Sequence, residues 1–316
     1  MRVAVLDDYQ HVATTMADWT QLPGDVTVTV FSDHQPQPDA LAARLKGYEI
    51  VCIMRERTPF TREVFEKLPD MKLLITTGMR NASVDMQAAA DHGVTVCGTA
   101  GSSSATPELA FGLALALARK IPNENNAMRQ GHWQLTVGQG MKGRTMGLLG
   151  LGNLGTKVAK YAQAFEMETI AWSQNLTAEA AAAKGVRRVE KDELFRQSDF
   201  ISVHLVLSER SRGIVGAREL GLMKPTAHII NTSRGPIIDE DALAEALRNG
   251  AIAGAGIDTY SVEPVAKTNP FLDLKNTVLT PHLGYVTEET YHIFYGQTVE
   301  NIAAWLKGQP VRVITA

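Results

Sequence analysis

Short runs of β-branched and other apolar residues alternate with helix-like stretches along almost the whole chain, and no other feature restricts its fold as strongly. Up to residue 100 the apolar runs are RVAVL, VTVTVF, EIVCIM, MKLLIT and VTVCG. From residue 145 the pattern restarts with TMGLLG, TIAWS, FISVHL, HIINTS, AIAGAGID and TVLTP. Strands that alternate with helices build parallel sheets covered by helices. The sequence therefore predicts an α/β protein with two Rossmann-like parallel-sheet domains.

The same pattern predicts that the first domain is discontinuous. The chain has 316 residues, enough for two domains at about 150 residues each. The small-residue stretch GSSSAT at 101–106 has the composition of a linker, and TPELAFGLALALARKI after it reads as one long helix. A last helix pattern follows Pro281, and a single helix cannot bury its own apolar face. We therefore expect residues 1–101 and 284–316 to form one domain and residues 102–283 the other.

Composition excludes several classes of protein. The net charge of -3 comes from 31 basic and 34 acidic residues without a basic cluster, which argues against a nucleic-acid partner. The longest purely apolar run, Leu109 to Ala118, is far shorter than the roughly 20 residues of a membrane span. Cys52 and Cys97 lie inside apolar runs, which indicates buried thiols in a reducing, cytoplasmic compartment. No spacing resembles a metal site.

The stretch GLLGLGNLG predicts a dinucleotide site in the second domain. Gly150, Gly152 and Gly155 form a G-x-G-x-x-G pattern directly after a strand-like run and before the amphipathic run KVAKYAQAF. The first glycine permits a tight turn, the second lets the backbone approach a pyrophosphate, and the third lets helix and strand pack closely. The amides of the helix's first turn, which includes Asn153 and Leu154, then face the phosphates. The alternative to a dinucleotide site is a glycine-rich turn without a ligand.

The residues after the second strand of this domain leave the cofactor open between NAD and NADP. A carboxylate about 20 residues beyond the motif would bind the adenosine ribose, but here Ser173, Gln174 and Asn175 stand in that place. Nothing there repels a 2′-phosphate, and no arginine nearby attracts one. The first basic residue that follows is Lys184, beyond an alanine-rich helix. The pattern slightly favours NAD.

Three polar residues follow later strands, at the edge where open α/β sheets bind ligands. They are Arg234 in NTSRGP, Glu263 in YSVEP and His282 in TPHLGY. Arginine can hold a carboxylate and polarise a carbonyl, histidine can donate a proton near neutral pH, and a carboxylate can orient that imidazole. The set predicts hydride transfer between a nicotinamide and C2 of a small 2-oxo or 2-hydroxy acid. Taken singly, each could instead be a surface or turn residue.

These motifs resemble the D-isomer-specific 2-hydroxyacid dehydrogenases, the family that includes phosphoglycerate dehydrogenase and glyoxylate/hydroxypyruvate reductases. GLGNLG, NTSRGPIIDEDAL, GAGIDTYSVEP and TPHLGY stand in the family's order over nearly the whole chain. The resemblance implies that Arg234 binds substrate and that His282 is the acid/base partnered by Glu263. It also implies that Asp258 holds the nicotinamide carboxamide. The remaining residues that we expect at the cofactor are His204, Thr232 and Gly284.

The resemblance further implies a substrate-binding first domain, a dinucleotide-binding second domain and a ligand cleft between them. The loop around Gly78 and Met79 would offer amides to the substrate carboxylate, and Arg80 replaces a glycine of the family's pattern there. Arg80 either enters the substrate site, joined by Arg55 at the end of the IVCIM run, or pairs with Asp85 at the surface. A homodimer would form through the segment after residue 104.

Two other functions share parts of this pattern. A dinucleotide-sensing binding protein on the same scaffold, like the C-terminal-binding corepressors, keeps similar polar residues without turnover. A dehydrogenase of another small anion, such as formate or phosphite, fits less well because His282 needs a substrate oxygen to protonate.

Overall fold

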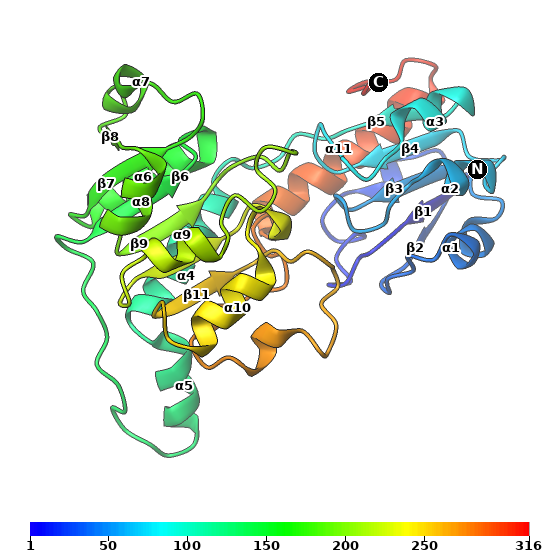
Figure 1. Cartoon of the computed structure of the whole chain (residues 1–316). Helices are drawn as coiled ribbons and strands as arrows, with labels where there is room; N and C mark the ends of the chain where they lie inside the picture. Colours follow the sequence, from blue (N-terminus) through cyan, green and yellow to red (C-terminus); the bar gives the residue numbers. More distant parts are fainter. Residues whose placement is uncertain (316) are drawn as a thin grey trace. The chain divides into compact units, whose positions relative to one another are not determined.

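The computed structural model describes residues 1–315 and divides into two compact units (Figure 1). Unit 1 comprises residues 1–102 together with the chain from residue 287 onward, and unit 2 comprises residues 103–286. The chain therefore leaves unit 1 after Ser102, where we expected Gly101, and re-enters it at Thr287, where we expected Gly284. Each unit has its own parallel sheet.

Unit 1 contains a five-stranded parallel sheet in the order β2-β1-β3-β4-β5. This is the flavodoxin-like doubly wound order. Each strand falls in one of the first five apolar runs of the sequence, and the central strands β3 and β4 are buried at every position. The strands are β1 (Arg2–Val5), β2 (Thr27–Val30), β3 (Ile50–Ile53), β4 (Leu73–Thr76) and β5 (Thr95–Cys97). The helices are α1 (Pro38–Leu45), α2 (Arg62–Glu66), α3 (Met86–Asp91) and α11 (Glu288–Leu306), with the short 3-10 turn η1 (Trp19–Gln21).

The last helix, α11, belongs to unit 1 although it follows all of unit 2 in the sequence (Figure 1). Tyr291, Phe294, Tyr295 and Ile302 are buried, while Trp305 is half-buried. Inside the unit, Asn301 Nδ2 donates to the carbonyl of Gly98 at 2.8 Å. The VRVI run after the helix forms no regular strand; it makes an isolated antiparallel bridge between Val313 and Cys97 at the edge of β5.

Unit 2 contains a seven-stranded parallel sheet in the order β12-β11-β10-β9-β6-β7-β8. The chain order along the sheet reverses between β6 and β9, which is the Rossmann arrangement and places the switch point beside the glycine motif. The strands are β6 (Thr145–Leu149), β7 (Glu168–Trp172), β8 (Arg187–Arg188), β9 (Phe200–Val203), β10 (His228–Asn231), β11 (Gly254–Ile257) and β12 (Thr277–Leu279). The helices are α4 (Ala105–Ala118), α5 (Ile121–Arg129), α6 (Asn153–Ala164), α7 (Ala178–Ala182), α8 (Lys191–Gln197), α9 (Ala217–Leu222) and α10 (Glu240–Arg248), with 3-10 turns η2 (Gly235–Ile237) and η3 (Pro270–Asp273). The expected fold class is confirmed.

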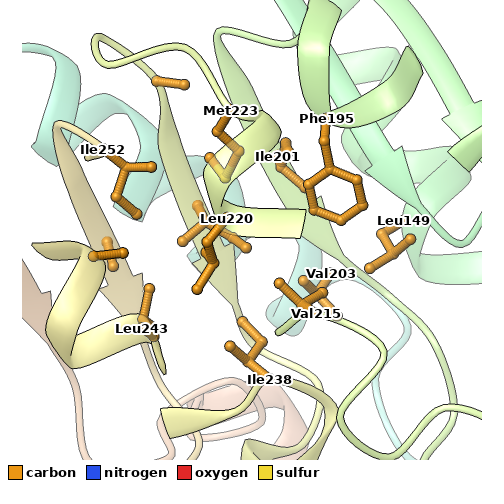
Figure 2. Packing of buried hydrophobic residues seen from close by; sticks show 14 of the residues in the cluster. Leu149, Phe195, Ile201, Val203, Val215, Leu220, Met223, Ile238, Leu243 and Ile252 are labelled. Carbon is orange, nitrogen blue, oxygen red and sulfur yellow. The ribbon is translucent and has the colours of Figure 1, made fainter. Parts of the chain in front are cut away.

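A large apolar cluster fixes the half of this sheet that carries the catalytic candidates. Figure 2 shows Ile201 and Val203 of β9 facing Phe195 of α8 and Leu220 of α9. Burying each large apolar side chain contributes about 1.5–3 kcal/mol. This packing therefore holds the carboxyl ends of β9 to β12, where the polar loops begin, in fixed positions.

Two details of unit 2 differ from the sequence-based expectation. The sequence predicts six strands, but the structure adds β8, which the apolar pattern cannot show because it consists of Arg187 and Arg188. The segment from Thr106 to Ile121 is also not one helix. Lys120 has a left-handed backbone (φ 54°) and caps α5, whose first turn contains Pro122. Since proline cannot continue a helix begun before it, α4 ends at Ala118.

No helix within residues 1–315 is long and apolar enough to cross a membrane.

Candidate active site

The glycine motif forms the turn between β6 and α6 that a pyrophosphate would need. Gly150 has φ 107°, and a Cβ atom there would lie 2.9 Å from the backbone of His204. A Cβ atom at Gly155 would lie 2.1 Å from the Gly150 carbonyl oxygen. At Gly152, by contrast, a Cβ atom would meet nothing within 4 Å, so this backbone faces open space. The first and third glycines are required by the protein's own packing, and the second leaves room for a ligand.

Polar groups around this turn fit a bound dinucleotide. Helix α6 begins at Gly152 without a side-chain cap, which leaves its first-turn amides available to an anion. His204 Nε2 and Thr232 Oγ1 are buried and have no hydrogen-bond partner among residues 1–315. Burial lowers the pKa of His204 to about 4, so its imidazole is neutral at neutral pH. Buried polar atoms without a protein partner are groups that a bound nucleotide could pair with.

Ser173 follows β7 directly beside the glycine turn. Leu149 of β6 and Trp172 of β7 are paired in register, and the Gly150 amide donates to the Trp172 carbonyl at 2.9 Å. Ser173 is half-buried, and Gln174 is exposed. These two residues therefore occupy the place where a ribose acid would stand, and they are neutral.

His282 and Glu263 form a hydrogen-bonded pair in unit 2. His282 Nδ1 lies 2.6 Å from Glu263 Oε2, while Glu263 Oε1 accepts from the Tyr260 amide at 2.9 Å. Both side chains are partly exposed. Because Nδ1 is engaged by the carboxylate, Nε2 is the ring nitrogen left to exchange a proton with a ligand.

The loop that carries Arg234 is packed against the loop that carries Glu263. A Cβ atom at Gly235 would lie 2.1 Å from the Tyr260 carbonyl carbon, so only glycine permits this approach. Asn231 fixes the loop from inside: its Nδ2 donates to the Arg234 carbonyl at 3.0 Å, and its Oδ1 accepts from the Ser233 amide at 3.0 Å. The structure thus brings the loops of all three catalytic candidates together at one edge of the unit 2 sheet.

Asp258 is fully buried and holds the loop of His282. Its carboxylate accepts from Thr280 Oγ1 at 2.6 Å and from the amides of Leu283 and Gly284 at 2.7 and 2.9 Å. Burial raises the pKa of Asp258, and these hydrogen bonds oppose the rise. This positioning role was not predicted from the sequence; an acid directly after a strand, opposite a TPH turn, was the available signal.

In unit 1, the loop after β4 offers fewer amides than the sequence suggested. Gly78 has φ 89°, and its amide donates to Thr99 Oγ1 at 2.9 Å, so it is not available to a ligand. Met79 and Arg80 are exposed. Arg55 Nη1 lies 2.1 Å from where a Cβ atom of residue 78 would stand, which explains the glycine there.

Comparison with known proteins identifies the family. The D-isomer specific 2-hydroxyacid dehydrogenase NAD-binding domain matches residues 111–284. A glyoxylate reductase from Thermococcus litoralis is 37% identical over 258 residues, covering 78% of each chain. The crystal structure of a phosphoglycerate oxidoreductase from Vibrio cholerae O395 is 34% identical, with a TM-score of 0.93, and covers 98% of this chain and 99% of that chain.

The chain belongs to the D-isomer-specific 2-hydroxyacid dehydrogenase family. It is an NAD(P)-dependent oxidoreductase of this family, as the sequence predicted. An acyclic imino acid reductase solved with NADPH and D-Arg is also similar, at 30% identity and a TM-score of 0.77 over 99% of this chain and all of that chain. Because these relatives are named as enzymes, a sensor without turnover is not favoured.

Proposed function

We propose that this dehydrogenase interconverts a small 2-oxo acid and its D-2-hydroxy acid, with His282 as the acid/base and Arg234 as the substrate cation. The observation that carries the proposal is the 2.6 Å pair of His282 Nδ1 and Glu263 Oε2. This pair leaves Nε2 of the imidazole for the substrate and places the Glu263 carboxylate at Nδ1, on the other side of the ring. The close packing of Gly235 on Tyr260 supports Arg234 beside that pair.

Each residue then has a distinct task. In the reducing direction His282 donates its Nε2 proton to the carbonyl oxygen, and in the oxidising direction it takes the proton back from the hydroxyl. Glu263 holds the ring orientation and stabilises the imidazolium. Arg234 binds the carboxylate and polarises the carbonyl through its planar fork. When bound, the nicotinamide gives or accepts the hydride at C2.

The cofactor is proposed to lie on the glycine turn and the loops beside it. Gly152, Asn153, Leu154 and the α6 amides would hold the pyrophosphate, and Ser173 and Gln174 the adenosine ribose. His204, Thr232 and Gly284 complete the proposed contacts. We propose that Asp258 acts on the nicotinamide end mainly by holding the loop of residues 280–284, because its carboxylate is already engaged there.

In unit 1, Met79 and Arg80 are proposed to bind a substrate carboxylate. Among residues 1–315 no hydrogen bond or ion pair of the Arg80 side chain is found. Asp85, the acid that would tether it to the surface, instead caps α3 through the Ala88 amide at 2.8 Å. Arg80 is thus free to select substrates with a further anionic group.

A homodimer through the segment after residue 104 is part of the proposal. Helix α5 and the irregular segment after it extend away from the unit 2 sheet (Figure 1). Trp133 and Val137 are 73% and 93% exposed, and Ile121, Met128 and Leu135 are exposed as well. Several large apolar side chains exposed within one short segment support an interaction surface there, and a second copy could cover them symmetrically. The free, buried thiols of Cys52 and Cys97 support a reducing, cytoplasmic location.

Steady-state assays with a panel of 2-oxo acids and both reduced cofactors test this function. Turnover of at least one 2-oxo acid, with formation of the D-isomer, is the expected result. Tight nucleotide binding without turnover of any panel member would contradict it.

A further inference from the structure

Lys184 is the one basic side chain near the end of β7 that the fold brings onto the glycine turn, within the part of the chain described here. Its Nζ donates to the Leu151 carbonyl at 2.7 Å. Leu151 lies between Gly150 and Gly152, in the turn whose backbone faces the proposed cofactor. Arg187 and Arg188 follow closely in the sequence but point elsewhere: Arg187 bonds to Gln197 and Arg188 to Glu190.

The position of this ammonium corresponds to the ribose end of the cofactor. The ribose 2′ oxygen is expected beside the first residue after the second strand of the domain, here Ser173. The Gly150 amide donates to the Trp172 carbonyl at 2.9 Å, and Leu151 and Ser173 are the residues that follow these two along the chain. An ammonium hydrogen-bonded to Leu151 would therefore be within reach of a 2′ substituent on a ribose bound beside Ser173.

The charge of Lys184 is not neutralised in this place. Among residues 1–315 no carboxylate is paired with it, and a carbonyl oxygen is its only hydrogen-bond partner found. An ammonium has three donors, so two remain. Ser173, Gln174 and Asn175 add neutral hydrogen-bonding groups and no negative charge. The surroundings fit a phosphate group better than a bare ribose hydroxyl.

We propose that Lys184 is a specificity-determining residue that binds the 2′-phosphate of NADP(H), so that the enzyme prefers NADP(H) to NAD(H). This replaces the slight preference for NAD that the sequence suggested, because the sequence separation of Lys184 from the glycine motif hid their contact. The assignment rests on the proposed dinucleotide site.

Calorimetric titration of the whole enzyme with adenosine 2′,5′-bisphosphate and with ADP tests the assignment without turnover. The wild type should bind the 2′-phosphorylated probe about tenfold more tightly or better, as expected for a charge-assisted hydrogen bond. Lys184→Met keeps the aliphatic stem and should remove that preference while ADP affinity stays within about twofold. Lys184→Arg should restore most of it, and the control Arg187→Met should leave it unchanged.

The outcomes separate this assignment from the function on which it rests. Equal wild-type affinity for the two probes, or an equal loss of both in Lys184→Met, would overturn the role of Lys184 and leave the dinucleotide site intact. Failure of the wild type to bind either probe would overturn the dinucleotide site itself and the assignment with it. As a second check, Ser173→Asp should weaken binding of the 2′-phosphorylated probe far more than binding of ADP, because the added carboxylate repels the 2′-phosphate.

Discussion

Glu263 Oε2 lies 2.6 Å from His282 Nδ1, although the two residues belong to different loops and come together only through the parallel order of β11 and β12. The pair engages Nδ1 and leaves Nε2 as the ring nitrogen for a proton transfer. In the proposed mechanism Glu263 acts on the ring, so its substitution tests the acid/base function apart from substrate binding.

His282→Gln should lower kcat by about 100-fold or more, because glutamine keeps the side chain's polarity but provides no titratable proton. Glu263→Gln should have a milder effect and should move the alkaline limb of the kcat/KM profile for reduction to lower pH, because the imidazolium that donates the proton loses its stabilising partner. Rates across pH for both variants, with cofactor affinity as the control, check this. Near-normal turnover of His282→Gln would contradict the mechanism.

Gly235→Ala should reduce kcat by about tenfold or more, because a Cβ atom 2.1 Å from the Tyr260 carbonyl carbon must displace the loop of Glu263. The matched control is Gly221→Ala in α9, where a Cβ atom would meet nothing within 4 Å. Steady-state kinetics and thermal unfolding of both variants measure the effect. If the two variants behaved alike, the close packing of these loops would have no part in catalysis.

Arg80→Ala should raise KM about tenfold for a dianionic 2-oxo acid and hardly change it for pyruvate, because the lost contact is to a second charge. Michaelis constants for oxaloacetate and pyruvate give the comparison. Arg62→Ala, which removes an exposed arginine paired with Asp91, serves as the control. Equal changes for both substrates, or none, would assign Arg80 to the solvent-exposed surface.

Val137→Glu should convert a dimer to a monomer, because it puts a charge into an apolar surface that a second copy would desolvate. Light scattering coupled to gel filtration measures the mass. Leu272→Glu alters another exposed apolar residue of unit 2, outside this segment, and should leave the mass unchanged. A wild-type enzyme that is monomeric at micromolar concentration would already contradict the proposed dimer.

His228 should make the folded state less stable in acid. The ring is buried against Phe200, with ring centroids 5.2 Å apart, and its nitrogens have no partner among residues 1–315. Burial lowers its pKa from 6.5 to about 4. Between these values the unfolded chain binds the proton and the folded chain does not, so the free energy of unfolding decreases as pH falls from 6.5 to 4, by at most about 3 kcal/mol.

Denaturant unfolding between pH 4 and 7 measures this decrease. His228→Phe should flatten the pH dependence in that range, whereas His132→Gln at an exposed position should not. An unchanged slope in His228→Phe would show that other groups dominate acid unfolding.

The sequence by itself determined the fold class, the glycine turn and the identity of the three catalytic candidates. These follow from local patterns: apolar runs of strand length, a G-x-G-x-x-G spacing, and polar residues placed directly after strands. Local patterns fail where a strand is formed by pairing alone, as in the two arginines of β8. They also missed the left-handed Lys120 that separates α4 from α5.

Only the tertiary structure decided which distant polar groups form hydrogen bonds with each other. The Gly78 amide donates to Thr99, and the Leu283 amide donates to the carboxylate of Asp258. The ammonium of Lys184 donates to the Leu151 carbonyl. Each hydrogen bond joins residues at least 21 positions apart. Such contacts depend on strand order and helix packing, which place the groups within about 3 Å of each other, and no periodicity in the sequence encodes that distance.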